Sequence, residues 1–153
     1  TPDIRPTRER VRGFEQAYRD AGIDPAEATE IAVVFSASFA HEKAVELLRL
    51  PVRRRPTAFI AGGVQATIGI LEAMSELGIR AGDDVSLIVC DDLPWLRVMR
   101  PQISSVSRDA VDMGRAAADM VLSLLGGSTP SSVMLPTTYH VRETTQFAPG
   151  SRR

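Results

Sequence analysis

The sequence predicts an α/β fold with a doubly wound parallel sheet, and three observations support this prediction. Short apolar runs alternate along the chain with longer segments in which apolar residues recur every three or four positions. The short runs are apolar along their whole length, which is typical of strands buried on both faces of a parallel sheet. At 153 residues, with 44% hydrophobic and 24% charged residues, the chain has the size and composition of one globular domain.

The amino-terminal part predicts a helix, a strand and a second helix. The first helix covers residues 7–21, where Val11, Phe14 and Tyr18 have helical spacing, and Gly22 ends it. Residues 31–35 form an apolar run too short for a helix, so we expect a buried strand there. The second helix covers residues 38–49 and ends before Pro51.

The middle of the chain repeats this order. Residues 57–61 predict a strand, Gly62 and Gly63 a turn, and residues 64–77 a helix that ends at Gly78. Residues 85–90 predict the next strand, which stops at Asp91 and Asp92. A short helix over 94–99 follows.

The carboxyl-terminal part predicts a brief extended segment over 103–106 and a long helix over 110–125. The helix has its apolar stripe at Val111, Gly114, Ala118, Val121 and Leu125. Two short strands are expected over 133–135 and 139–141, separated by Pro136. Residues 148–153 form a tail that we expect to be frayed.

Several classes of function are excluded or unsupported. The net charge of −1 supplies no basic field for nucleic acid, and the single cysteine, Cys90, excludes an internal disulfide. No apolar run is long enough to span a membrane, and no phosphate-binding glycine loop, zinc-protease motif or hydrolase elbow is present. We therefore expect no cofactor, no metal and no catalytic residue. The first residues have neither an initiator methionine nor an apolar signal core, which indicates a cut inside a longer protein.

The carboxyl ends of the parallel strands are the expected ligand site. Asp91 and Asp92 end one strand, and their side chains should point in opposite directions, so one carboxylate faces a ligand while the other caps the next helix. Capping alone, or a metal or phosphate-acceptor role for Asp91, are the alternatives. Arg10 either binds a ligand or lies on a solvated helix face, and Trp95 either makes a ligand or subunit contact or is half-buried.

Several segments together closely resemble the lac repressor/galactose repressor (LacI/GalR) family of transcription regulators. They begin with Arg10-Val11-Arg12-Gly13-Phe14 and continue through the segments at 55–61, 69–80, 84–88, 91–92, 103–106, 114–117 and 135–137. The resemblance implies the periplasmic-binding-protein-like type I fold, mainly its carboxyl-terminal subdomain. It covers nearly the whole chain, in the family's order and spacing.

The resemblance implies roles for individual residues. Arg10 matches an arginine that binds effector hydroxyls or carboxylate, Asp91 an acceptor, and Phe35 an aromatic that stacks on the ligand. Gly63, with Val64, replaces the family's usual Asn-Asp, so a polar contact and a helix cap are missing. A homodimer is expected through the turn that contains Trp95, Leu96 and Met99.

The resemblance also implies a domain division. Residues 1–106 belong to the carboxyl-terminal subdomain, 107–136 are a crossover helix and strand that normally complete the other subdomain, 137–147 return, and 148–153 are the tail. Without that other subdomain, we expect the 107–136 segment to pack aberrantly, to be disordered or to contact another chain, rather than to take an ordered position on this chain's own core. The resemblance predicts a cytoplasmic regulator, not an enzyme, that senses a small molecule such as a sugar or related metabolite, with DNA bound only through an absent headpiece. The alternatives are a periplasmic sugar-binding protein and, third, a flavodoxin-like or receiver-like enzyme.

Overall fold

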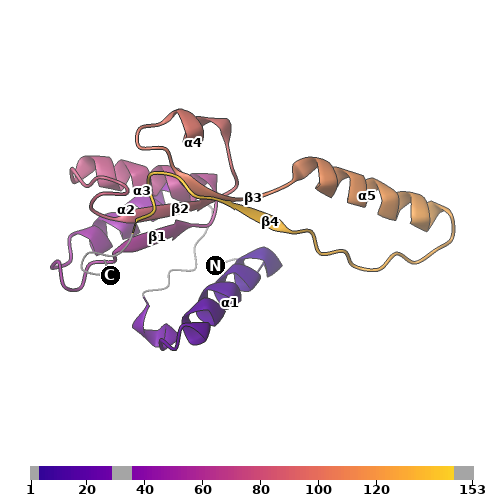
Figure 1. Cartoon of the computed structure of the whole chain (residues 1–153), viewed down its shortest axis with the longest axis horizontal. Helices are drawn as coiled ribbons and strands as arrows, with labels where there is room; N and C mark the ends of the chain where they lie inside the picture. Colours follow the sequence, from indigo (N-terminus) through magenta and orange to yellow (C-terminus); the bar gives the residue numbers. More distant parts are fainter. Residues whose placement is uncertain (1–3, 29–35, 147–153) are drawn as a thin grey trace.

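The computed structural model describes residues 4–28 and 36–146, in which helices and strands alternate for most of the length (Figure 1). The elements are α1 (Arg5–Asp20), η1 (Pro25–Glu27), α2 (Ala37–Leu48), β1 (Ala58–Ala61), α3 (Val64–Glu76), β2 (Ser86–Cys90), α4 (Pro94–Val98), β3 (Ser104–Arg108), α5 (Ala110–Leu125) and β4 (Thr137–His140). All the predicted helices are present, with ends within two residues of expectation. The strand predicted over 31–35 lies outside the described residues.

The strands form one open sheet in the order β1-β2-β3-β4. The first three strands are parallel, and β4 returns antiparallel to β3. The registers pair Ala61 with Val89 and Cys90 with Val106, so the carboxyl ends of β1, β2 and β3 lie along one edge of the sheet. This mostly parallel sheet confirms the predicted α/β class.

One face of the sheet carries the hydrophobic core. Leu87 and Val89 of β2 point to this face and are 0% and 1% exposed. Helix α3 packs on β1 and β2, and α2 packs on α3. Gly69 permits this helix contact, because a Cβ atom there would lie 2.7 Å from the His41 backbone nitrogen and would collide with the Ala37 carbonyl oxygen.

The opposite face is more open, although the apolar strands led us to expect helices on both faces. Ile60 of β1 points to this face and is 56% exposed. Helix α1 has no buried residue, and its main packing partner is η1 (Figure 1). A half-buried stripe on α1 includes Phe14 and Tyr18, whose ring centroids lie 4.9 Å apart. The apolar pattern of a strand shows that both of its faces are suited to burial. A face is buried only where a helix packs on that side of the sheet.

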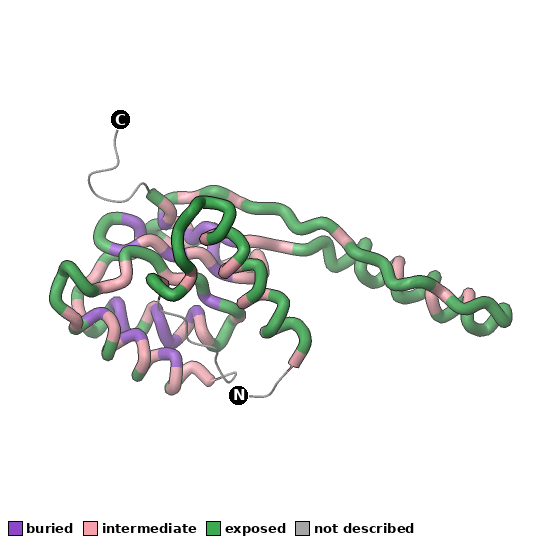
Figure 2. Tube along the Cα trace, turned by 90° about the horizontal axis from the view of Figure 1, so that it is seen from below, coloured by how far each residue is buried: buried purple, intermediate pink, exposed green. Residues whose placement is uncertain are grey.

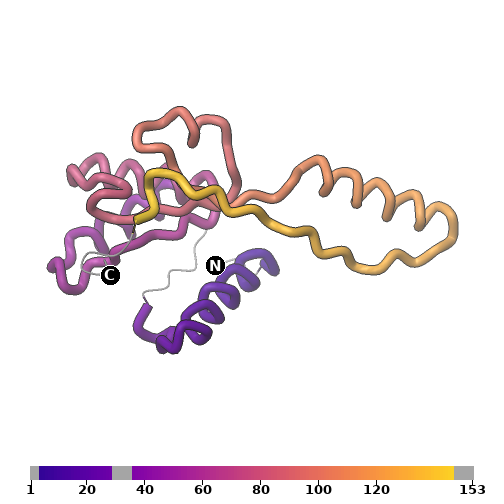
Figure 3. Tube along the Cα trace, in the orientation of Figure 1, coloured from indigo at the N-terminus to yellow at the C-terminus, as the bar shows by residue number. Residues whose placement is uncertain are grey.

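Helix α5 and the return segment 126–136 form an arm that projects away from the core (Figures 1 and 3). No residue of α5 is buried, and its predicted core positions Val111, Val121 and Leu125 are 68%, 54% and 80% exposed (Figure 2). The predicted buried stripe of this helix is therefore corrected: the helix forms, but this chain provides no surface that covers it.

The strand predicted over 133–135 is absent, because residues 128–136 contain no strand. A short extended segment needs a neighbouring strand for its backbone hydrogen bonds, and the arm supplies none. The divisions at 106/107, 136/137 and 147/148 remain predictions. Within the described part of the chain, no helix combines the length and apolarity needed to cross a bilayer.

Candidate functional site

The carboxyl edge of the sheet brings together residues from separate parts of the chain. Asp91 directly follows β2, Gly63 begins the turn into α3 two residues after β1, and Arg108 is the last residue of β3. Because these strands are parallel and in register, their ends meet at one edge. Sequence analysis predicted Asp91 and Gly63 at this edge. It missed Arg108, although the position of an arginine at the end of a third parallel strand was a usable signal.

Asp91 is held in an unusual backbone conformation and faces outward. Its φ of 76° lies in the left-handed region, which side chains other than glycine seldom adopt and which is common at functional sites. Its amide nitrogen donates a 2.8 Å hydrogen bond to the Val106 carbonyl oxygen, which anchors the turn to β3. The Asp91 carboxylate lies 3.2 Å from Nη2 of Arg108, and the two side chains are 36% and 49% exposed. The carboxylate is therefore accessible and already has a cationic partner.

Asp92 points the other way, into the junction between the core and the arm. Its side chain is 4% exposed and receives both ends of the Arg142 guanidinium, at 2.8 and 2.9 Å. Ser105 Oγ donates to Asp92 Oδ1 at 2.8 Å, and Arg97 Nη2 donates to Asp92 Oδ2 at 2.8 Å. Arg142 also donates to the Ile103 carbonyl oxygen. Asp92 thus joins α4, β3 and the segment that follows β4.

These bonds set the charge state of Asp92. Hydrogen bonds from Arg142, with smaller contributions from Ser105 and Arg97, hold the pKa of the Asp92 carboxyl well below its usual range, although burial opposes them. The capping role considered for Asp92 is corrected, because the cap residue of α4 is Leu93 and no side chain caps that helix. The partners of Asp92 are up to fifty residues away in sequence, so no local pattern indicated them.

Cys90 ends β2 at this edge, and the charge of Arg10 on α1 acts on its thiol. Arg10 is half-buried on the stripe of α1 that also contains Phe14. Burial raises the pKa of the Cys90 thiol; the charge of Arg10 acts to lower this pKa, as does that of Arg108, and the charge of Asp91 acts to raise it. Arg10 and Arg108, which are remote from Cys90 in sequence, and Asp91, which follows it directly, therefore all influence one thiol.

The remaining predicted ligand residues are Gly63 and Phe35. Gly63 is extended, and a Cβ atom there would meet open space. The first turn of α3 consequently has no side-chain cap, although Thr67 donates from both its amide and its hydroxyl to the Gly63 carbonyl oxygen. Phe35 lies outside the described residues.

The turn around α4 was predicted to form a dimer surface. Leu96 is 1% exposed and belongs to the hydrophobic core, which corrects the expectation that it contacts a partner. Trp95 and Met99 are half-buried and pack against the same core, whereas Val98 is 74% exposed. Any contact made by this turn would use Val98 and the outer parts of Trp95 and Met99.

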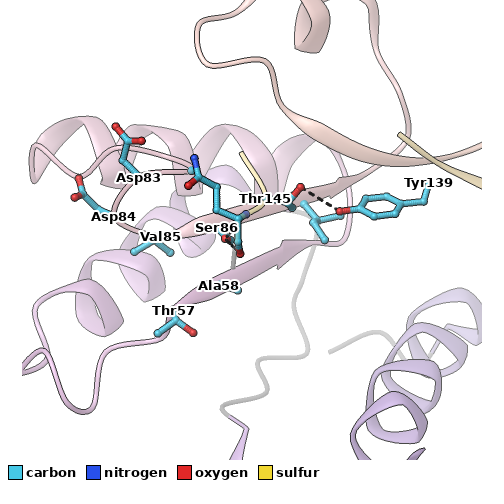
Figure 4. A pocket seen from close by; sticks show the side chains of 11 residues that line it. Thr57, Ala58, Asp83, Asp84, Val85, Ser86, Tyr139 and Thr145 are labelled. Carbon is cyan, nitrogen blue, oxygen red and sulfur yellow. Dashed lines mark hydrogen bonds between the residues drawn. The ribbon is translucent and has the colours of Figure 1, made fainter. Parts of the chain in front are cut away.

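A shallow cavity of about 360 Å³ lies at the opposite, amino-terminal end of β1 and β2 (Figure 4). Its lining includes Thr57, Asp84 and Tyr139, whose hydroxyl donates to Thr145 Oγ1 at 3.2 Å. Hydrogen bonds from Arg80 lower the pKa of Asp84, so this carboxylate is already engaged. No predicted ligand residue lines this cavity, and residues 4–28 and 36–146 contain no group of three or more His, Cys, Asp or Glu side chains that could hold a metal ion.

Comparisons with known proteins agree with the fold. The family model described as "Periplasmic binding protein-like domain" matches residues 2–145. The chain is 29% identical over 137 residues to a probable opine utilization operon repressor of Rhizobium rhizogenes, covering 87% of this chain and 68% of that protein. It is 30% identical over 113 residues to the HTH-type transcriptional repressor PurR of Escherichia coli, covering 74% of this chain and 33% of that protein.

A solved structure shows the same fold. The crystal structure of a regulatory protein of the LacI family from Chloroflexus aggregans matches with a TM-score of 0.82 and 24% identity, over 95% of this chain and 53% of that one. The chain thus spans about half the length of this structural neighbour and about a third of the Escherichia coli repressor.

Proposed function

The chain belongs to the periplasmic-binding-protein-like family, among the LacI/GalR-type transcription regulators, and from this we propose that it senses a small-molecule effector. The effector binds at the carboxyl edge of the sheet, with Asp91 and Arg10 as its polar contacts and Gly63 beside it. The chain forms a homodimer through the α4 turn. DNA is bound by a helix-turn-helix headpiece elsewhere in the regulator.

The observation that carries this proposal is the orientation of Asp91. The Asp91 backbone is in the left-handed region, and its carboxylate faces outward at the end of a parallel strand, where ligands of doubly wound folds bind. The strained backbone is maintained by the bond from its amide to β3 and by the burial of the adjacent Asp92.

The same pair of residues suggests how binding is transmitted. Asp91 faces the effector edge, whereas Asp92 joins the two segments that lead to and from the arm. These two segments can be arranged in more than one way relative to the core. A ligand that binds one arrangement more tightly than another shifts the equilibrium towards the arrangement that it binds more tightly. We infer that effector binding changes the position of the arm relative to the core.

A thermal-shift screen of this chain against sugars and nucleobases tests the binding site. We expect a ligand to raise the melting temperature of the wild type and to lose this effect in Asp91→Ala. Asp112→Ala is the matched control, because Asp112 is also an exposed carboxylate paired with an arginine, Arg115 at 3.1 Å, but lies on the arm. Equal stabilisation of Asp91→Ala and the wild type by the same ligand would contradict the assignment of Asp91.

Sedimentation velocity tests the dimer. We expect Val98→Asp to weaken self-association, because it places a charge on the exposed part of the α4 turn. Val52→Asp is the control, since Val52 is 79% exposed in the loop after α2. If both variants associate as the wild type does, the α4 turn is not the dimer surface.

A transport-linked sugar-binding protein is not favoured, because the curated relatives are transcriptional repressors. No observation on the described residues favours an enzyme.

A further inference from the structure

Helix α4 carries a single charged side chain, that of Arg97, between the buried Leu96 and the exposed Val98. The Arg97 guanidinium turns back towards Asp92, and its Nη2 and Nε atoms both donate to Asp92 Oδ2, at 2.8 and 3.2 Å. The Asp92 side chain is 4% exposed, whereas that of Arg97 is 61% exposed. A buried carboxylate therefore determines where an accessible cation lies.

Arg97 is the more easily released of the two arginines that bind Asp92. Arg142 is nearly buried and also donates to the Ile103 carbonyl oxygen and to Ser105 Oγ. Within residues 4–28 and 36–146, the Arg97 side chain has no hydrogen bond or ion pair except those to Asp92. Because ion pairs with an exposed partner contribute little to stability, a small movement of the junction is enough to release Arg97.

The position of α4 does not depend on the Arg97 bond. Leu96 belongs to the core, and its carbonyl oxygen accepts a 3.0 Å hydrogen bond from the Ile103 amide. The Met99 amide donates to the Trp95 carbonyl oxygen at 3.2 Å. If the bond to Asp92 broke, the turn would keep its place and the guanidinium would move.

A released Arg97 would lie beside the apolar part of the turn. Val98 follows it in the chain and is 74% exposed, and Trp95 and Met99 are half-buried. A second copy that covered these side chains would also remove water from the neighbouring guanidinium, and a charge without an anionic partner is costly to remove from water. In a dimer with two-fold symmetry the same cost arises in both copies.

We propose that Asp92 controls self-association through the α4 turn without touching the partner, by holding the Arg97 guanidinium away from Val98. This inference rests on the proposed dimer and links it to the effector edge, because Asp92 directly follows Asp91 in the chain. Asp92 is thus a positioning residue. A change at the edge that moves Asp92 alters the affinity of the two copies for each other, and dimerisation in turn favours the arrangement in which Arg97 is bound.

Sedimentation equilibrium of this chain tests the link with two variants that break different bonds of Asp92. Asp92→Asn removes the charge that holds Arg97, and we expect it to weaken self-association about tenfold. Arg142→Met removes the buried partner but leaves Arg97 paired, and should change self-association less than about twofold. Circular dichroism establishes that both variants are folded. Equal weakening by the two variants would overturn the proposal, because any loosening of the junction would then have the same effect.

A double variant isolates the effect of the released cation. Arg97→Met added to Asp92→Asn should restore most of the self-association, because both proteins leave Arg142 without its partner and only the cation differs. Added salt should reduce the defect of Asp92→Asn, since exposed charges are screened. A purely structural role of Asp92 would produce neither response. If the double variant associated as weakly as Asp92→Asn, the proposal would fall.

A second pair of variants leaves Asp92 and Arg142 intact, and so provides a test even if Asp92→Asn does not fold. Arg97→Glu introduces an anion that Asp92 repels and that lies beside Val98, and should weaken self-association about tenfold. Arg97→Met, which is neutral, should associate at least as tightly as the wild type. Both should fold, because the side chain at this position is largely exposed. Association of Arg97→Glu at the wild-type level would overturn the proposal.

The outcomes separate this inference from the proposed dimer. If Val98→Asp weakens self-association but Asp92→Asn and Arg97→Glu do not, the α4 dimer stands and its control by Asp92 falls. If the wild type does not self-associate, or if Val98→Asp associates as the wild type does, both are contradicted.

Discussion

The core and the arm contain helices with similar apolar patterns and opposite environments. In α3, Ala73 and Met74 are 0% and 2% exposed, because α2 and the sheet lie against them. In α5, Leu122 and Leu125 are 66% and 80% exposed, because no other element of the described chain packs there. A stripe of apolar residues therefore makes a helix suitable for burial, but its contribution to stability depends on the surface that covers it.

The largest expected difference between the two regions concerns leucine truncation. Leu87→Ala should lower the free energy of unfolding by about 3–5 kcal/mol, because it leaves a cavity in a fully buried site. Leu122→Ala on the arm should change it by less than about 0.5 kcal/mol. Urea unfolding followed by circular dichroism measures both values. A comparable loss in Leu122→Ala would show that the arm is covered in solution.

The junction between the regions should be almost as sensitive as the core. Asp92→Asn leaves Arg142, whose side chain is 11% exposed, without its charged partner, and should cost about 3 kcal/mol. Asp112→Asn, in an exposed pair on the arm, should cost less than about 1 kcal/mol. Chemical denaturation provides the comparison. If the two variants were equally stable, the Asp92 bonds would not hold the junction together.

The same substitution, glycine to alanine, should change the stability in opposite directions at two positions. Gly69→Ala should destabilise by about 2 kcal/mol, since its Cβ collides with the backbone of α2. Gly114→Ala should stabilise by about 0.5–1 kcal/mol, because a Cβ there meets nothing within 4 Å and alanine favours the helix. Melting temperatures of the two variants test this contrast. Destabilisation by Gly114→Ala would indicate a close neighbour of α5.

The smallest expected effect is a change with pH in the contribution of Asp92 to the free energy of unfolding. Because the folded state lowers the pKa of Asp92 below its unfolded value of about 4, its contribution is complete above about pH 5 and declines as the pH falls below 4. Asp92→Asn should therefore lose less stability between about pH 5 and 3 than the wild type does. Denaturation at several pH values measures these slopes, and parallel slopes would contradict the lowered pKa.

Much of the core could be predicted from sequence, because its elements are specified locally. The helical spacing within 64–77 and the apolar run within 85–90 each appear in a window shorter than about fifteen residues. The prediction of a strand over 133–135 was wrong, because a strand is not specified locally. A strand exists only with a partner, and the sequence shows the suitable residues without showing whether a partner is near them.

The candidate site was predictable in part. Asp91 and Gly63 follow predicted parallel strands, so their shared edge could be inferred from topology. The ion pair of Asp91 with Arg108 could not, because it depends on how far the side chains extend once β2 and β3 are in register. Leu96 illustrates the same limit, since apolar residues suit both a core and an interface, and only packing distinguished them.

The sequence by itself determined the order and type of the elements, the parallel sheet and the edge at which Asp91 lies, because these depend on residues near one another in the chain. Only the tertiary structure decided that Asp92 is buried against Arg142, that Asp91 pairs with Arg108, and that α5 stands free of the core. These features depend on distances between residues far apart in sequence, and such distances are set by packing rather than by periodicity.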